Sequence, residues 1–198
     1  MIWAVFGPQA TLSINLLTAP LLPAAMAIPL TQVYDALEKR GYKLIHSENF
    51  PSQGSLSLPD LVIAIIRQHP ERHVINGLPV ILHNAEGKEI EELSERSKAE
   101  SLQNPIGYLY ETVSGCIQNS GRRDGVDSLV HGYNFLAPIG KEFIIPRGLK
   151  ESTLEVLRGK RTKTATKWNV VDYDREVDFA STIEKYIKRA TPQTLWEG

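Results

Sequence analysis

The chain has 198 residues, of which 42% are hydrophobic and 23% are charged, and its formal net charge is −1 at pH 7. Its length allows a substantial hydrophobic core, and this composition is typical of a folded protein, which excludes a wholly disordered chain. Because the charge is close to neutral, a protein that binds polyanions through a large overall positive charge is also excluded, and any nucleic-acid contact needs a local patch.

The N-terminal 25 residues carry no charged side chain and are rich in Leu, Ala and Pro. A secretory signal ending at the small residues 25–27 is one interpretation, but the segment lacks a basic start, and prolines interrupt the apolar run that a signal or a spanning helix needs. The other interpretation is that the protein starts at Met26. We expect residues 1–25 to be an uncharged extension with little structure, 28–190 to form one mostly helical globular domain, and 191–198 to be a tail.

The helical spacing of apolar residues predicts helices through most of this domain. In chain order they cover 31–40, 57–69, 71–84, 85–104, 105–118, 126–136, 152–159 and 176–190. Thr31 should cap the first helix, and Ser57 the second, which is the most apolar and should be buried before it ends at Pro70. Gly77 and Pro79 should split the third helix in two.

The chain changes character in its C-terminal third. Residues 141–148 favour a short strand, and 164–174 are rich in β-forming residues, so that the helix at 152–159, capped by Ser152, would be followed by a β-ribbon. The predicted fold class is therefore mainly α: a helical core with a small β element, in outline a helix plus β-ribbon, in this third. The closing helix should face the core with four apolar residues: Val177, Ala180, Ile183 and Ile187.

The stretch RGKRTKTATKW at 158–168 holds the main functional signal. It contains five basic side chains and no acid: Arg158, Lys160, Arg161, Lys163 and Lys167. Residues 141–167, called the basic segment below, hold eight Lys or Arg against three Glu. Such cations can neutralise phosphates, and the ring of Trp168 could stack on a base or pack inward. Strand-like alternation would place Lys163 and Lys167 on the face opposite Trp168.

A plainer interpretation is that nearby acids neutralise these cations within the fold. Four of them follow closely: Asp172, Asp174, Glu176 and Asp178. Exposed charge runs are usually of this kind, and their ion pairs contribute little to stability.

Other polar groups indicate weaker sites. His69 and His73 have the spacing of a helical zinc pair, but Pro70 lies between them and the HExxH pattern is not met. Cys116, the only cysteine, could act as a nucleophile with His131 if the fold brought them together, although its place in an apolar stripe favours a core position. We expect no metal and no cofactor.

A polar turn at 119–125 carries Arg122 and Arg123, which could clamp a phosphate or a carboxylate. The patterns of a P-loop, of a dinucleotide-binding turn and of a nucleophile elbow do not occur in the sequence.

Three functions are therefore hypotheses. The first is a small cytosolic regulatory or accessory protein that binds DNA or RNA through the basic side chains of 158–167 with support from Trp168. The second is a helical adaptor that binds another protein through an apolar groove beside the acidic helix near 85–100. The third is an enzyme of unknown class. The single cysteine favours a reducing, cytoplasmic compartment, and nothing in the sequence calls for a membrane partner.

Overall fold

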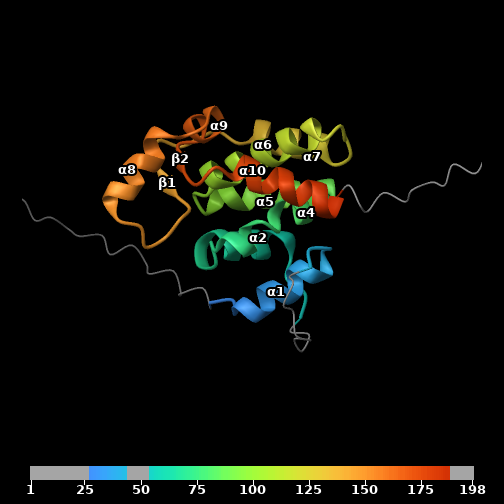
Figure 1. Ribbon diagram of the computed structural model, residues 1–198. Coiled ribbons are helices and arrows are strands. Elements are labelled where there is room, and N and C mark those ends of the chain that lie inside the picture. Colours follow the sequence, from blue (N-terminus) through green and yellow to red (C-terminus); the bar gives the residue numbers. More distant parts are fainter. Residues whose placement is uncertain (1–26, 44–53, 188–198) are drawn as a thin grey trace, which may run out of the picture.

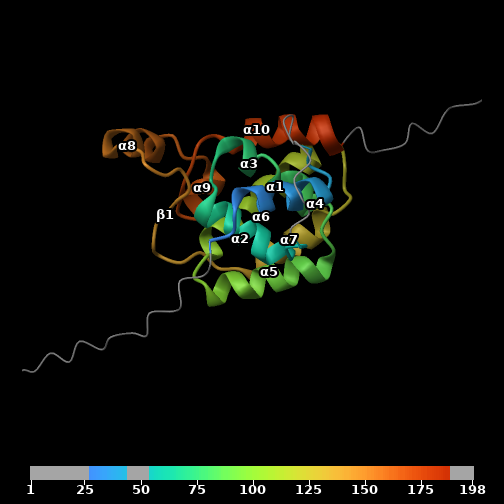
Figure 2. The ribbon, with the colours of Figure 1, turned by 90° about the horizontal axis from the view of Figure 1, so that it is seen from below.

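One long helix, α6 (Gln103–Asn119), lies at the centre of the computed structural model, which describes residues 27–43 and 54–187 (Figures 1 and 2). The other helices are, in chain order, α1 (Leu30–Lys39), α2 (Leu58–Gln68), α3 (Arg72–Ile75), α4 (Leu78–His83), α5 (Gly87–Ala99), α7 (Val126–Phe135), α8 (Glu151–Gly159), α9 (Lys163–Lys167), α10 (Arg175–Thr182) and the π-helical turn η1 (Ile183–Ile187). Two short strands, β1 (Phe143–Ile144) and β2 (Val170–Val171), complete the fold. The predicted mainly α class is confirmed.

A single cluster of buried apolar side chains runs from Val33 in α1 to Ile187 in η1. The predicted N-terminal extension (1–25) and tail (191–198) lie outside the described residues. Within the described part of the chain, no helix is both long and apolar enough to cross a membrane.

Local signals explain most of the N-terminal helices. Ser57 caps α2 as predicted, because its Oγ accepts a hydrogen bond from the backbone N–H of Asp60 at 3.2 Å. The predicted split at Gly77 is also confirmed, since α3 ends before it and α4 begins after it. The first helix differs from the prediction: Pro29 occupies its cap position, so that Thr31 lies inside α1 and does not cap it.

The β element of the C-terminal third is confirmed, and it is a parallel pair in which Phe143 lies opposite Val170. A parallel pair cannot be closed by a tight turn, and α8 and α9 occupy the connection. The strand predicted through 163–167 is wrong: these residues form α9, because the Oγ1 of Thr162 accepts from the backbone N–H of Ala165 at 3.1 Å and starts a helix there.

Two details of the last helices also differ from prediction. Lys150 occupies the cap position of α8, and Ser152 lies within its first turn. In α10, Val177 and Ala180 are predicted in the core, but both are exposed, Val177 to 66%, whereas Phe179 is fully buried. The inward face of α10 is therefore rotated away from the one that apolar spacing predicts, although Ile183 and Ile187 do point inward.

A buried ionic network accounts for this rotation. Arg175 is 1% exposed, and its guanidinium donates two hydrogen bonds to Asp172, at 2.8 and 2.9 Å. Asp178, one turn along α10, accepts a hydrogen bond at 2.8 Å from Nε of Arg72 in α3. A buried charge must keep its partner, so Arg175 and Asp178 define the inner face, and Val177 is turned to solvent. Burial raises the pKa of Asp172 even though Arg175 opposes this shift.

A very close approach joins α6 to the basic segment. The indole of Trp168 lies directly on the backbone of Gly107, where a β-carbon would be only 2.2 Å from the ring. Trp168 is consequently 1% exposed. Because no larger residue leaves room for the ring, Gly107 permits the contact that attaches α9 and β2 to the central helix.

We expect Gly107→Ala to lower the free energy of unfolding by about 3 kcal/mol, at the upper end of the range for overpacked cores, because the ring must shift away from α6. Chemical denaturation measures this change.

Gly115→Ala is the matched control, since Gly115 lies on the same helix and a β-carbon there meets nothing within 4 Å. It should stabilise the protein by up to about 1 kcal/mol through helix propensity alone. Equal effects of the two substitutions would contradict the close packing of Trp168 on Gly107.

Candidate functional site

Trp168 is an anchor of the fold and is not placed to stack on a base. Its indole Nε1–H donates a hydrogen bond at 2.7 Å to Oε2 of Glu111, which lies one turn after Gly107 on α6. With 1% of its surface exposed, the ring has no free face for a nucleotide. The structure thus assigns Trp168 the inward-packing alternative.

Lys167 shares the acceptor of Trp168. Its Nζ lies 2.6 Å from the same Glu111 oxygen, 5.3 Å from the ring centre of Tyr133 and 5.4 Å from that of Trp168. The side chain is still 49% exposed. Lys167 is therefore held at the junction of α9 with α6 and α7, and its charge is largely matched by one carboxylate.

The two arginines of 158–168 form ion pairs inside the basic segment. Arg158 donates to Glu142 at 2.8 and 3.0 Å and also contacts Glu151, and Arg161 lies 3.6 Å from Glu142. Arg161 also donates to the side-chain oxygen of Asn169 at 3.3 Å. The hydrogen bonds from Arg158 hold the pKa of Glu142 below its ordinary value. These contacts tie α8 to the segment before β1.

Lys160 and Lys163 differ from the other three cations of 158–168, because both are exposed and have no ion pair within 27–43 and 54–187. Lys160 follows the end of α8, and Lys163 begins α9. Three further cations of the basic segment are exposed and lack an ion pair over the same described ranges: Lys141, Arg147 and Lys150. Sequence reasoning counted these three but did not single them out.

None of the four acids predicted to neutralise the five cations of 158–168 pairs with them, and Asp174 and Glu176 form no ion pair over the described ranges. Asp172 pairs with Arg175, and Asp178 pairs with Arg72. The paired cations of 158–168 instead contact Glu142 and Glu151 from the basic segment itself and Glu111 from α6. The acids named by the plainer interpretation are therefore wrong, although three of the five cations are paired within the fold through these other acids. No local sequence signal identifies Glu111, which lies 56 residues before Lys167.

The structure does not bring Cys116 and His131 together, because they line different grooves. Cys116 is 7% exposed on α6, and its thiol donates a weak hydrogen bond to the carbonyl oxygen of Glu176 at 3.6 Å. Burial raises the pKa of this thiol to about 11, which disfavours the nucleophilic thiolate. Nothing in this geometry supports the Cys–His arrangement that the enzyme hypothesis considered.

The two histidines of the predicted zinc pair also have different hydrogen-bond partners. His69 contacts the carbonyl oxygen of Ile28 through Nε2 at 2.7 Å, and His73 contacts the hydroxyl of Tyr34 at 2.8 Å. Across the described residues, no group of three or more His, Cys, Asp or Glu side chains is arranged to hold a metal ion.

A shallow groove lies between the acidic helix α5 and α7, where the adaptor hypothesis expected one. Glu91 and Glu95 line one side, and Phe135, which is 47% exposed, lies on the other with the ammonium of Lys98 3.2 Å above its ring. The groove has a volume of about 130 Å³, which is below the usual range for a ligand site. Lys98 already covers Phe135, the apolar side chain of the groove, so we assign no partner to this groove.

The turn with Arg122 and Arg123 borders an open hollow of about 640 Å³, which Asp127 also lines. Behind this turn lies His83, whose Nδ1 is buried and has no hydrogen-bond partner among the described residues. Burial, and after it the positive charge of Arg122, lowers the pKa of His83. The hollow thus carries two guanidinium groups and one carboxylate, and the anion clamp expected at Arg122 and Arg123 stays a prediction.

Comparison of the chain with protein-family models, with curated proteins and with solved structures found no match.

We expect the ring of His83 to titrate below its ordinary value of 6.5. Because the folded pKa is lowered, the unfolded chain takes up the proton first, and the free energy of unfolding should fall as the pH drops below about 6.5. NMR titration of the ring protons measures the pKa, and Arg122→Gln should raise it. A pKa above 6.5, or one that Arg122→Gln leaves unchanged, would contradict this description.

Proposed function

We propose that this protein binds nucleic acid through the basic segment, by contacts to phosphates that need no base stacking. The observation that supports the proposal is the charge left over after ion pairs are assigned. Five exposed cations of this segment have no ion pair within the described ranges: Lys141, Arg147, Lys150, Lys160 and Lys163. Only one exposed acid of the same segment, Glu155, is similarly without a pair there.

The shape of the segment also suits a long, charged partner. In both ribbon views α8 stands at one edge of the molecule, away from the packed helices around α6 (Figures 1 and 2). Of its nine residues only Leu154 is buried. A duplex or a single strand could therefore lie along this edge without displacing any core helix, and phosphate neutralisation there would release counterions.

The internal ion pairs have a defined part in this proposal. Arg158 and Arg161 hold α8 against Glu142, and the Trp168–Glu111 bond holds α9 against α6. These contacts fix the backbone from which Lys160 and Lys163 extend. The proposed site therefore keeps two of the five cations that the sequence suggested as phosphate contacts and gives the other three, together with Trp168, a positioning role.

Fluorescence anisotropy with labelled duplex and single-stranded oligonucleotides, over a series of salt concentrations, tests the proposal. Affinity should fall steeply with salt. The variant Lys160→Gln/Lys163→Gln should bind more weakly and should show a shallower salt dependence, by about 0.9 in slope for each duplex phosphate that the variant no longer neutralises.

The matched control is Lys39→Gln/Lys88→Gln, which lowers the net charge by the same two units on α1 and α5. It should keep the wild-type slope. Absence of binding to either form of nucleic acid at low salt, or an equal loss in the control, would overturn the proposal.

A further inference from the structure

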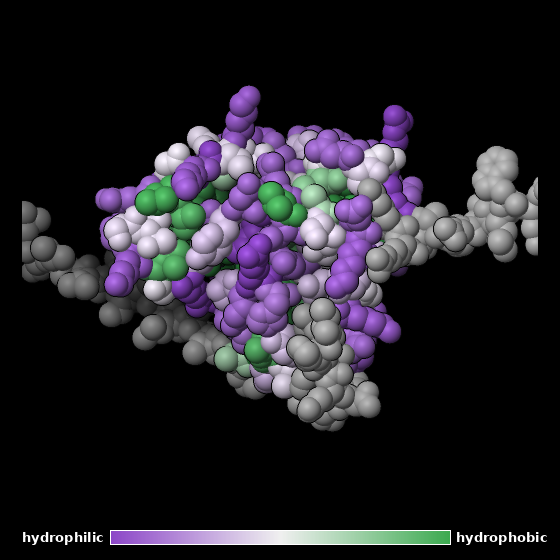
Figure 3. Space-filling view, in the orientation of Figure 1, coloured by the Kyte–Doolittle hydropathy of each residue, from purple (hydrophilic) through white to green (hydrophobic). Residues whose placement is uncertain are grey.

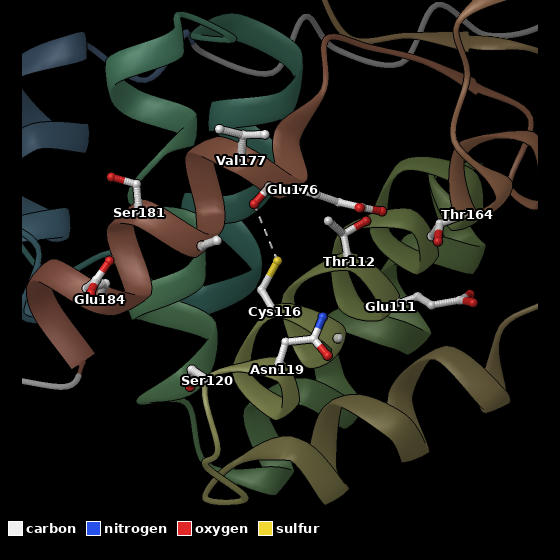
Figure 4. Close-up of a pocket in the computed structure, with 12 residues that line it drawn as sticks. Glu111, Thr112, Cys116, Asn119, Ser120, Thr164, Glu176, Val177, Ser181 and Glu184 are labelled. Atoms are coloured by element: carbon white, nitrogen blue, oxygen red, sulfur yellow. Dashed lines mark hydrogen bonds between the residues drawn. The ribbon is translucent and has the colours of Figure 1, made fainter.

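A second region is a groove of about 620 Å³ between α6 and the last helical stretch of the chain, with Thr164 of α9 also in its lining. Figure 4 shows its walls: Thr112, Cys116 and Asn119 come from α6, and Val177, Ser181 and Glu184 come from α10 and η1. This volume lies within the usual range for small-molecule sites.

The groove is acidic. Three carboxylates line it, namely those of Glu111, Glu176 and Glu184, and no Lys or Arg occurs among the described residues of its lining. Glu176 and Glu184 are exposed and have no ion pair over the described ranges, whereas Glu111 is already engaged by Lys167 and Trp168. Two carboxylates are thus available to a cation.

The middle of the groove is lined by small or apolar residues. Gly115 and Cys116 form its floor on α6, and Val177 and Ala180 lie on the facing helix. Val177 is 66% exposed, so its side chain is accessible from the groove. Methylene groups of a ligand would find contact here. Figure 3 shows that the exposed apolar side chains on this face form small, separate patches within a mostly polar surface.

A buried hydroxyl adds an independent sign of a ligand. Thr112 is 4% exposed, and its Oγ1 has no hydrogen-bond partner among the described residues. In Figure 4 its side chain points from α6 toward α10, on the same side of the helix as that of Cys116. A buried hydroxyl without a partner costs stability, and a ligand N–H donated to it would recover part of that cost.

From these observations we infer that the groove binds a linear aliphatic polyamine. Glu176 in α10 and Glu184 in η1 are eight residues apart, which on an α-helix corresponds to about 12 Å between their backbones along the axis. An extended chain with an ammonium group near each end matches that separation, and its methylene groups would lie on Val177 and Ala180. The groove borders the basic segment, because Thr164 of α9 also lines it, but none of the cations proposed to contact phosphates does, and the inference does not depend on nucleic-acid binding.

Isothermal titration calorimetry of the full chain with spermidine, without nucleic acid and at constant ionic strength, tests the inference. We expect saturable binding at one site, which ethylamine at the same ionic strength does not reproduce. Glu176→Gln/Glu184→Gln should lower the affinity at least tenfold, and Thr112→Val should lower it about threefold.

The matched control is Glu91→Gln/Glu95→Gln, which removes two exposed acids from α5 and should leave the affinity unchanged. Val177→Arg provides a second test that keeps the fold, because this exposed position would then place a cation in the groove and abolish binding. Heat that does not saturate, equal losses in the α5 control, or full binding by Val177→Arg would overturn the inference.

Discussion

The contact of Trp168 with Gly107 and Glu111 decides how the C-terminal third is arranged. The ring can lie on the α6 backbone only because Gly107 has no side chain, and the indole N–H finds its acceptor one turn later on the same helix. A buried indole needs such an acceptor, since an unpaired N–H in the core would be costly. Two short strands and two short helices are thereby attached to the helical core, to which Ala165 of α9 and Val170 of β2 add buried side chains.

This anchor divides the cations of the basic segment into two groups. Lys167 is drawn to the carboxylate that Trp168 already uses, and Arg158 is drawn to Glu142. Lys160 and Lys163 lie between these fixed points and remain exposed. Charge density in the sequence therefore overstates the surface available to a phosphate, and the ion pairs of the fold determine which cations are left.

Much of the fold was predictable because its signals are local. Ser57 and the split at Gly77 act within one or two helical turns, and both predictions are confirmed. The predictions that fail involve either ion pairs that apolar spacing does not show or a local capping bond that competes with the predicted strand. The sequence after Thr162 favours a strand by composition, yet its cap bond to Ala165 starts a helix. In α10, apolar spacing favours Val177, but pairing of Arg175 with Asp172 turns that side outward. The unused carboxylates of the α6–α10 groove are visible only once this rotation is known.

The central claim is that Trp168 holds the basic segment in place while its free cations contact phosphates. The most direct test is an NMR titration of ¹⁵N-labelled protein with an oligonucleotide, following the indole Nε1–H of Trp168 together with the backbone amides of Lys160 and Lys163. The account predicts that the amides shift while the indole signal keeps its position and its protection from solvent exchange. An indole signal that shifts as strongly as the amides would show that the ring meets the nucleic acid, and unchanged amides would show that these lysines do not.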